Sequence, residues 1–470
     1  MNDYSKKTKH LPDYRADVRH TRLGNAFYDV VEAAKFPKTK LRFRNDKAAM
    51  EIGLDRLSDE DWVRHFGRFE PLPDNLEKPL ALRYHGHQFR SYNPDLGDGR
   101  GFLFAQMRDK TGRLMDLGTK GSGQTPWSRN GDGRLTLKGG VREVLATEML
   151  EARGVNTSRS LSLIETGEAL TRGDEPSPTR SSVLVRLNHS HVRIGTFQRL
   201  LYLEDHDSLQ KLVDYSIAEY WPDAANTIGL LDAVVGAVAR LGAQWFAAGF
   251  VHGVLNTDNI TITGESFDYG PWRFLPKLDP NFTAAYFDHQ GLYAFARQPD
   301  ALYWNLARFA ECLAPLSEFQ PLKNTLETFP KRFEKQLGSA ALARLGLVPD
   351  DAERDYRLAN LFFAAQADSG CGFEQSVFDM AGGARAERIA ASPQSDLYVS
   401  DGWKAAISAL QEREVSDIAA DAVSTHPPGD NPQDMLIDEV EAIWADIDQK
   451  DDWSAFQNKI SAIRASSFNI

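Results

Sequence analysis

The chain has 470 residues, of which 42% are hydrophobic and 26% charged, a composition that is ordinary for a globular protein. Its formal net charge of −12 argues against a general nucleic-acid binder, because such proteins carry a basic excess. The two cysteines, Cys312 and Cys371, lie far apart and give no metal or redox spacing, which favours a reducing cytoplasmic setting.

Residues 1 to about 75 are mixed and helix-leaning, and the N-terminal stretch lacks the apolar run of a secretory signal. From Leu82 onward, glycine, arginine and short apolar runs predominate. The runs FLFAQM (102–107) and LMDLGTK (114–120) predict two strands joined by a hairpin turn at DKTG (109–112). Helical spacing follows in VREVLATEMLEARG (141–154), and SSVLVRLN (181–188) and HVRIGTF (191–197) predict further strands.

After about residue 200 the pattern becomes helical. The most apolar run, 230–251, contains Asp232, Arg240 and Gln244, so it predicts a buried helix and no membrane span. It leads directly into HGVLNTDN (252–259), and NITITGESFDYGPW (259–272) predicts a short hairpin ending in Asp-Tyr-Gly. Helices are expected over 301–420, a linker at THPPGDNPQD (425–434), and an amphipathic terminal helix from Met435.

This order of elements is typical of kinases, so the sequence predicts an α+β, protein-kinase-like two-lobed fold with extensions at both ends. The expected division is an N-terminal extension packing on the N-lobe (1–80), an N-lobe of mixed β and α structure (81–200), a helical C-lobe (201–345) and a helical C-terminal extension (346–470).

The segment HGVLNTDN resembles the catalytic loop of kinases, which reads H-G/R-D-x-x-x-x-N. Val254 stands where the catalytic Asp is expected, but Asp258 follows four residues later, immediately before Asn259. Asn259 and Asp268 are candidate Mg²⁺ ligands, because a hard cation takes oxygen ligands and kinases supply them from these two places. Taken alone, either residue would be a capping or loop residue.

Lys120 ends a predicted strand before a Gly-rich turn, which suits a phosphate contact. Its expected partner is Glu143, which lies nearer than Glu148 to the helix end that faces the loop. Without this context, a lysine is most often a solvated surface residue.

Two Gly-rich segments offer further anion contacts. In LGDGR, Gly97 and Gly99 let backbone N–H groups approach a phosphate, and Arg100 adds a bidentate donor. The segment SRNGDGR repeats these possibilities with Asp132 and Gly133, although most such glycines only form turns. Two more candidates, in VRLNHSHVRIGTF, could converge on one phosphate, the alternative being ordinary surface arginines: Arg186 and Arg193.

These motifs occur together and in order: GHQF, LGDGR, KGSGQTPWSRNGDGR, VRE, SHVRIGTF, GFVHGVLNTDNI, FDYGP and QPDALYWNLARFA. In this combination, over about residues 80–315, the chain resembles the selenoprotein O (SelO, also YdiU or UPF0061) family. The resemblance implies a pseudokinase-like protein adenylyltransferase that binds ATP in a flipped orientation. Such an enzyme transfers AMP to Ser, Thr or Tyr hydroxyls, with Mg²⁺ or Mn²⁺ as cofactor and UTP as a further donor.

The resemblance also implies roles for single residues. Asp258 matches the proton acceptor, and Asn259 with Asp268 match the metal ligands, Asp268 also contacting the nucleotide. The nucleotide contacts implied by the family motifs are Gly97, Gly99, Arg100, Lys120, Asp132, Gly133, Arg186 and Arg193, with Glu143 as the ion-pair partner of Lys120.

The chain departs from the family at three places: Arg90 after GHQF, GGVRE at the helix start, and a C-terminal SSFNI without cysteine, which makes a redox switch there unexpected. Two other functions stay open from the residues alone. One is phosphate transfer with Asp258 as a shifted base, and the other is a non-catalytic nucleotide-binding scaffold.

Overall fold

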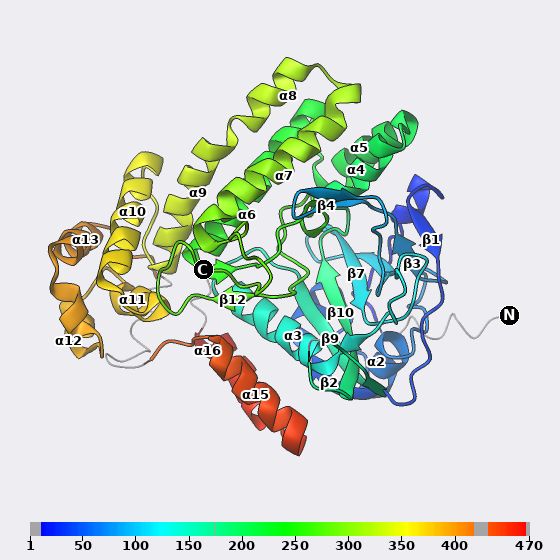
Figure 1. The fold of residues 1–470 in the computed structure, drawn as a ribbon, viewed down its shortest axis with the longest axis horizontal. Helices are drawn as coiled ribbons and strands as arrows, with labels where there is room; N and C mark the ends of the chain where they lie inside the picture. The colour runs from blue at the N-terminus through cyan, green and yellow to red at the C-terminus, as the bar shows by residue number, and fades with distance from the viewer. Residues whose placement is uncertain (1–10, 174, 418–430, 467–470) are drawn as a thin grey trace.

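The computed structural model describes residues 11–173, 175–417 and 431–466, and it combines one antiparallel sheet with a large helical part (Figure 1). Most of the predicted linker at 425–434 and the last four residues of the C-terminus lie outside the described residues. The protein is therefore an α+β protein, as the sequence predicts.

The main sheet runs in the order β1-β3-β6-β7-β10-β9-β2, with β8 pairing β10 at one end, and every pairing is antiparallel. Its strands are β1 (Tyr28–Val30), β2 (Lys40–Arg44), β3 (Leu80–Leu82), β6 (Leu103–Arg108), β7 (Leu114–Lys120), β8 (Leu135–Thr136), β9 (Arg159–Leu170) and β10 (Thr179–Asn188). The predicted strands at 102–107, 114–120 and 181–188 are confirmed. The first 75 or so residues, predicted to lean toward helix, also supply two strands of this sheet, β1 and β2.

Two short hairpins lie outside the sheet: β4 (Gly86–Gln88) with β5 (Ser91–Asn93), and β11 (Phe250–Val251) with β12 (Arg273–Phe274). The helices are α1 (Asp46–Glu51), α2 (Asp59–Phe66), α3 (Leu137–Ala152), α4 (Ile194–Tyr202), α5 (His206–Tyr220), α6 (Thr227–Ala247), α7 (Gln298–Leu313), α8 (Phe319–Leu326), α9 (Phe329–Arg344), α10 (Ala352–Ser369), α11 (Phe373–Met380), α12 (Ala386–Ala391), α13 (Asp401–Gln411), α15 (Ile437–Lys450) and α16 (Ser454–Ser466).

The sheet carries a hydrophobic core on each face because its strand residues alternate between them. In β10, Val183 and Val185 pack with Trp62 of α2 on one face, whereas Leu184 packs with Val144 of α3 on the other. The core on the α3 face continues into α5, α6, α7 and the C-terminal helices α15 and α16. A separate core joins α9, α10, α11 and α13. In Figure 1, α10, α11 and α13 lie at one end of the molecule, whereas α9 packs along α6.

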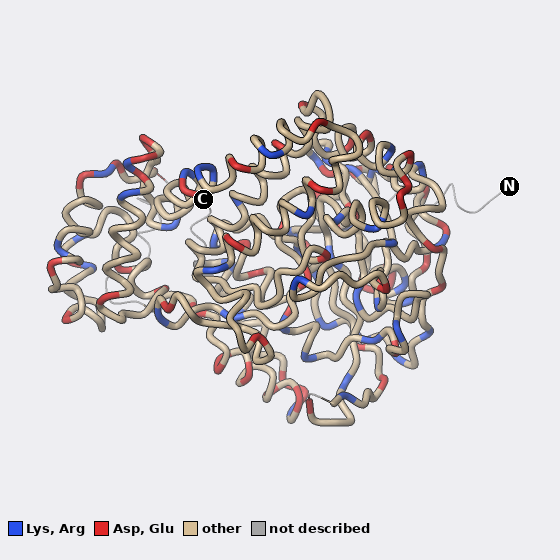
Figure 2. Tube along the Cα trace, turned by 45° about the horizontal axis from the view of Figure 1, so that its top comes forward, with Lys and Arg blue, Asp and Glu red and all other residues tan. Residues whose placement is uncertain are grey.

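Helix α6 is long and apolar enough to cross a membrane by length and composition alone, but 67% of its most apolar window is buried inside the protein. It is therefore a buried helix, as predicted for residues 230–251. Lysine and arginine residues are interspersed with acidic residues along the whole trace (Figure 2).

Two predicted elements are wrong. The segment HVRIGTF is not a strand, because α4 begins at Ile194, after Arg193 as its N-cap, with Ile194, Phe197 and Leu200 buried at helical spacing. The backbone N–H of Arg193 donates to Thr196 Oγ1 (3.3 Å), a bond that favours the helix start.

The predicted hairpin within 259–272 forms no strands either. Isolated bridges, Arg193 to Thr261 and Thr157 to Ser266, hold this segment as a loop, and Thr261 Oγ1 bonds both the N–H and the C=O of Glu265. The two strands that do pair here are β11 and β12. They lie before and after the segment that contains the catalytic-loop motif and the following loop.

Candidate functional site

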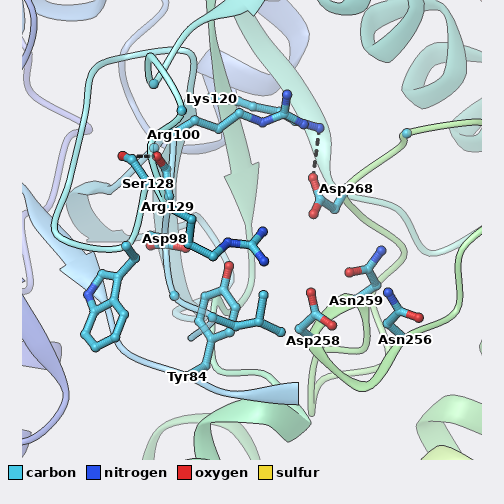
Figure 3. A pocket seen from close by; sticks show the side chains of 18 of the residues that line it. Tyr84, Asp98, Arg100, Lys120, Ser128, Arg129, Asn256, Asp258, Asn259 and Asp268 are labelled. Atoms are coloured by element: carbon cyan, nitrogen blue, oxygen red, sulfur yellow. Dashed lines mark hydrogen bonds and ion pairs between the residues drawn. The ribbon is translucent and has the colours of Figure 1, made fainter. Parts of the chain in front are cut away.

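A cavity of about 790 Å³ lies where the sheet, the two Gly-rich segments and the loops after α6 meet (Figure 3). Every site residue predicted from the sequence lines it except Glu143, which contacts the cavity through Lys120. The structure thus brings together residues from Gly97 to Asp268. Their roles toward a nucleotide stay predictions.

Lys120 closes β7 and sits in a buried charge cluster. Its ammonium donates to Glu143 of α3 and to Asp268 Oδ1 (2.8 Å), and Arg186 Nη1 lies 3.3 Å from the same Asp268 oxygen. Glu148, the alternative partner, lies on α3 but bonds Arg464 and Asn45 instead. In this cluster the carboxylates of Glu143 and Asp268 neutralise the positive charges of Lys120 and Arg186 at the wall of the cavity.

Asp268 lies in the loop that follows the short 3-10 turn η4 (Thr257–Asn259), and it takes a left-handed backbone conformation (φ +62°), which is rare for a residue other than glycine. Burial by itself would raise the pKa of its carboxyl. The positive charges of Lys120, Arg186 and Arg193 outweigh burial and hold that pKa well below its usual value. Asp268 is therefore a carboxylate at any physiological pH.

Arg193 links the first Gly-rich segment to the catalytic loop. Its Nη2 lies 3.2 Å from Asp98 Oδ1, and its Nη1 donates to the main-chain oxygen of Asp258 (3.2 Å). The guanidinium also stacks over the rings of Tyr84 (4.3 Å) and Phe267 (4.8 Å). Asp98, at the centre of GDG, was missed by sequence reasoning, which assigned that motif to backbone contacts only.

Asp258 lies in the short 3-10 turn η4 (Thr257–Asn259) and is buried. Burial raises the pKa of its carboxyl to about 6, although the nearby Arg193 acts in the opposite direction. Its Oδ1 has no hydrogen-bond partner in the described structure, so one acceptor remains available to a substrate proton. Val254, at the position of the usual kinase base, lines the same cavity without a polar group.

The donor set fits a hard divalent cation. The amide nitrogen of Asn259 donates to the Val254 carbonyl (3.1 Å), which leaves the amide oxygen as an acceptor beside the cavity. The Asp268 carboxylate adds further oxygen ligands beside the cavity, and carboxylate and amide oxygens suit Mg²⁺ or Mn²⁺. Within the described ranges no group of three or more His, Cys, Asp or Glu residues forms a metal centre, so a nucleotide's phosphates would have to complete the coordination.

The glycines of the two Gly-rich segments allow close packing of one segment on the other. A Cβ on Gly97 would lie 2.4 Å from the Trp127 ring, and one on Gly99 would lie 2.8 Å from the Trp127 carbonyl oxygen. Gly133 has a φ of +69°, and a Cβ there would overlap the Gly123 backbone. These glycines are thus required by the fold of the cavity wall as well as by any phosphate contact.

Asp132 lies at the rim and pairs with Arg172 (2.8 Å), a residue that the sequence did not single out. Arg100 also lines the cavity. Sequence reasoning further missed Trp127, Arg129 and Asn256, because single aromatic, basic or amide residues in loops carry no periodic or motif signal.

The comparisons with known proteins cover almost the whole chain. The profile of a family described as "Protein adenylyltransferase SelO" matches residues 13–464. A protein of Gloeobacter violaceus named "Protein nucleotidyltransferase YdiU" is 45% identical over 94% of this chain and 93% of its own length. Proteins with the same name are 43% identical in Synechocystis sp. (95% and 97%) and 39% identical in Vibrio cholerae (75% and 71%).

Proposed function

The chain belongs to the SelO family of protein adenylyltransferases, and from that premise we propose that it transfers AMP from ATP to Ser, Thr or Tyr hydroxyls of proteins, with UTP as a further donor. As a protein nucleotidyltransferase it acts on a nucleotide and on protein substrates. The observation that carries the finer proposal is the cavity, which Lys120, Arg186 and Arg193 line together with Asp258, a buried carboxyl whose pKa is raised to about 6.

In the proposed reaction, the hydroxyl of the acceptor protein gives its proton to Asp258, whose buried Oδ1 is free to accept it. The oxygen attacks the α-phosphorus, and the bond to the β,γ-pyrophosphate breaks. Lys120, Arg186 and Arg193 bind the pyrophosphate and offset the negative charge that it gains. The products are the AMP-protein ester and pyrophosphate.

A divalent cation, Mg²⁺ or Mn²⁺, would neutralise phosphate charge in this site, held by the oxygens of Asn259 and Asp268. The chain's own residues orient these ligands. Lys120 and Arg186 fix the Asp268 carboxylate, and the bond from Asn259 to the Val254 carbonyl fixes the side-chain amide.

We further propose that the architecture is kinase-like, in the four parts 1–80, 81–200, 201–345 and 346–470. Supporting this, a lysine at the end of β7 pairs with a glutamate of the following helix, α3, across from a loop with Asn259 and Asp268. A flipped nucleotide would bring its α-phosphate, rather than its γ-phosphate, to Asp258. It would also explain why Val254 is tolerated at the usual base position.

The test uses purified protein with Mg²⁺ or Mn²⁺ and ATP labelled either on the α-phosphate or on the γ-phosphate. We expect stable α-label on protein, its loss in Asp268→Ala, and a strong reduction in Asp258→Asn. Label from the γ-phosphate alone would refute AMP transfer and identify a phosphotransferase. ATP binding with no label of either kind would identify a non-catalytic scaffold.

A further inference from the structure

Arg129 lines the cavity but has no role in the reaction as set out so far. It precedes Asn130 in the second Gly-rich segment, and both residues have a left-handed backbone, with φ of +47° and +67°. Consecutive residues other than glycine in this region are strained, and such strain is found mainly at functional sites. Figure 3 shows the Arg129 side chain reaching from the rim into the cavity toward Asp258.

The segment that carries Arg129 is fixed at its base. Thr125 Oγ1 donates to the Asp98 carbonyl (2.5 Å), Ser128 Oγ donates to the Gly99 carbonyl (2.5 Å), and Trp127 Nε1 donates to Asp29 (2.9 Å). These bonds hold the backbone at residue 129 while leaving its side chain unconstrained. The Arg129 guanidinium is therefore positioned by its backbone, and no carboxylate of the described residues neutralises its charge.

Most other cations of the cavity are already paired. Their partners are Glu143 and Asp268 for Lys120, Asp268 for Arg186, Asp98 for Arg193, Glu168 for Arg134, and Asp132 for Arg172. In the part of the chain that the structure describes, the side chains of Arg100 and Arg129 have no ion pair or hydrogen bond. These two guanidiniums keep their full set of donors for a ligand.

Arg129 differs from Arg100 in what it faces. Its charge acts on the Asp258 carboxylate, as does that of Arg193. Arg193, however, is committed to Asp98 and to the main-chain oxygen of Asp258. Of the two guanidiniums that keep all their donors, Arg129 is therefore the one whose charge acts on Asp258 and whose side chain reaches toward it (Figure 3).

We propose that Arg129 is a further catalytic residue, whose guanidinium binds the nonbridging oxygens of the α-phosphate during transfer. The proposal rests on the AMP transfer proposed above. As the acceptor oxygen loses its proton to Asp258 and bonds to the α-phosphorus, the bond to pyrophosphate breaks and its electron pair leaves with pyrophosphate. Negative charge on the equatorial oxygens of the α-phosphate is held by Arg129, which neither gains nor loses a proton.

The test compares wild type with Arg129→Ala, Arg129→Lys and the control Arg240→Ala. Arg240 is exposed on α6, lies outside the cavity, and alanine favours a helix there. The probes are α-labelled ATP and the two diastereomers of ATP thio-substituted at the α-phosphate, with casein and the chain itself as acceptors. ATP affinity and thermal unfolding are measured on every variant.

For Arg129→Ala we expect kcat to fall on the order of 100-fold or more, while the Kd for ATP changes by less than about tenfold. Lysine should restore only part of the rate, because it supplies a point charge without the planar fork. The ratio of rates with the two thio-diastereomers should change in Arg129→Ala and stay at the wild-type value in Arg240→Ala. A merely structural role would leave that ratio unaltered.

The outcomes separate the two proposals. If wild type transfers α-label and Arg129→Ala does so at the same rate, or with an unaltered diastereomer ratio, the role of Arg129 is refuted and AMP transfer stands. If wild type binds ATP but transfers no α-label to either acceptor, AMP transfer itself is refuted, and the role of Arg129 with it.

Discussion

At the scale of single residues, the site depends on buried charges that neutralise one another. Lys120 is 6% exposed and Glu143 is 1% exposed, so neither charge is stabilised by water. Taking one partner away leaves the other charged group buried without compensation, which costs more than the pair contributes.

We therefore expect Lys120→Met, which keeps the volume and removes the charge, to lower the free energy of unfolding by about 3–5 kcal/mol. Adding Glu143→Gln should recover part of this loss, because the uncompensated carboxylate is then gone. Thermal unfolding of the two single variants and the double variant measures the coupling. Additive effects of the two substitutions would contradict the buried pair.

A second buried carboxyl, Glu265, gives a pH-dependent prediction for stability. Burial raises its pKa to about 7, although it accepts a bond from the His189 N–H (2.8 Å). Because the folded-state pKa lies above the unfolded value of about 4.5, folding favours the protonated form. The contribution of Glu265 to stability is complete below about pH 4.5 and is lost as the pH rises to about 7.

In Glu265→Gln the side chain stays neutral, so this loss should disappear. Relative to wild type, the variant should gain about 3 kcal/mol of unfolding free energy between pH 4.5 and pH 8. Unfolding midpoints of both proteins at pH 4.5, 6 and 8 check this, since all other groups titrate alike in the two. A difference that does not vary with pH would contradict the raised pKa.

At the scale of elements, α3 is the helix that places Glu143 against Lys120, and the C-terminal helices hold α3. Arg464 of α16 forms a two-pronged pair with the buried Glu148, at 2.7 and 2.8 Å. Glu441 of α15 lies 2.7 Å from Lys138 and 3.4 Å from Arg142, both on α3. In Figure 1, α15 and α16 lie beside α3.

We expect Arg464→Ala to lower the free energy of unfolding by about 2–4 kcal/mol, because Glu148 loses its charged partner in a buried place. It should also lower the rate of AMP transfer through looser placement of α3, and Arg464→Lys should recover part of both. The matched control is Lys450→Ala, which removes an exposed i,i+4 pair with Asp446 and should change stability by less than about 0.5 kcal/mol. Equal effects of Arg464→Ala and Lys450→Ala would contradict the role of α16.

At the scale of the whole molecule, the site depends on segments that are distant in sequence. The sheet supplies Lys120 and Arg186, whereas the loops after α6 supply Asn259 and Asp268. A ligand that contacts both groups stabilises the arrangement as a whole, by an amount that grows with its concentration.

Metal removal should therefore weaken the effect of the nucleotide on stability. ATP with Mg²⁺ at a concentration about 100 times its Kd should stabilise the protein by about 2.7 kcal/mol, seen as a higher Tm. With EDTA the shift should shrink, since phosphates then meet the carboxylates of Asp258 and Asp268 without a cation between them. In Asp268→Ala, EDTA should make little further difference, and a metal effect as large as in wild type would contradict Asp268 as a ligand.

Many of the strands and helices could be predicted, because hydrophobic spacing and turn residues close together in the sequence indicate them. Strand β7 spans the predicted 114–120, and the helical spacing at 141–154 falls within and just beyond α3. The prediction of a strand at 191–197 was wrong, because a short apolar run such as the one with Val192 and Ile194 is compatible with either a strand or a helix. The helix is selected by tertiary contacts, since Gly195 lies so close to the His85 carbonyl that a Cβ would stand 2.1 Å from it.

By itself, the sequence determined the family of the protein, the α+β class and those residues of the cavity that belong to the recognised motifs, because each depends on motifs and on hydrophobic spacing along the chain. Apart from the pair of Lys120 with Glu143, which the motifs predicted, only the tertiary structure decided which charges neutralise one another. Arg193 meets Asp98 across 95 residues of sequence, and Arg464 meets Glu148 across 316. Such pairs leave no local pattern, because the physical condition that selects them, two charged groups buried together, exists only after the chain has folded.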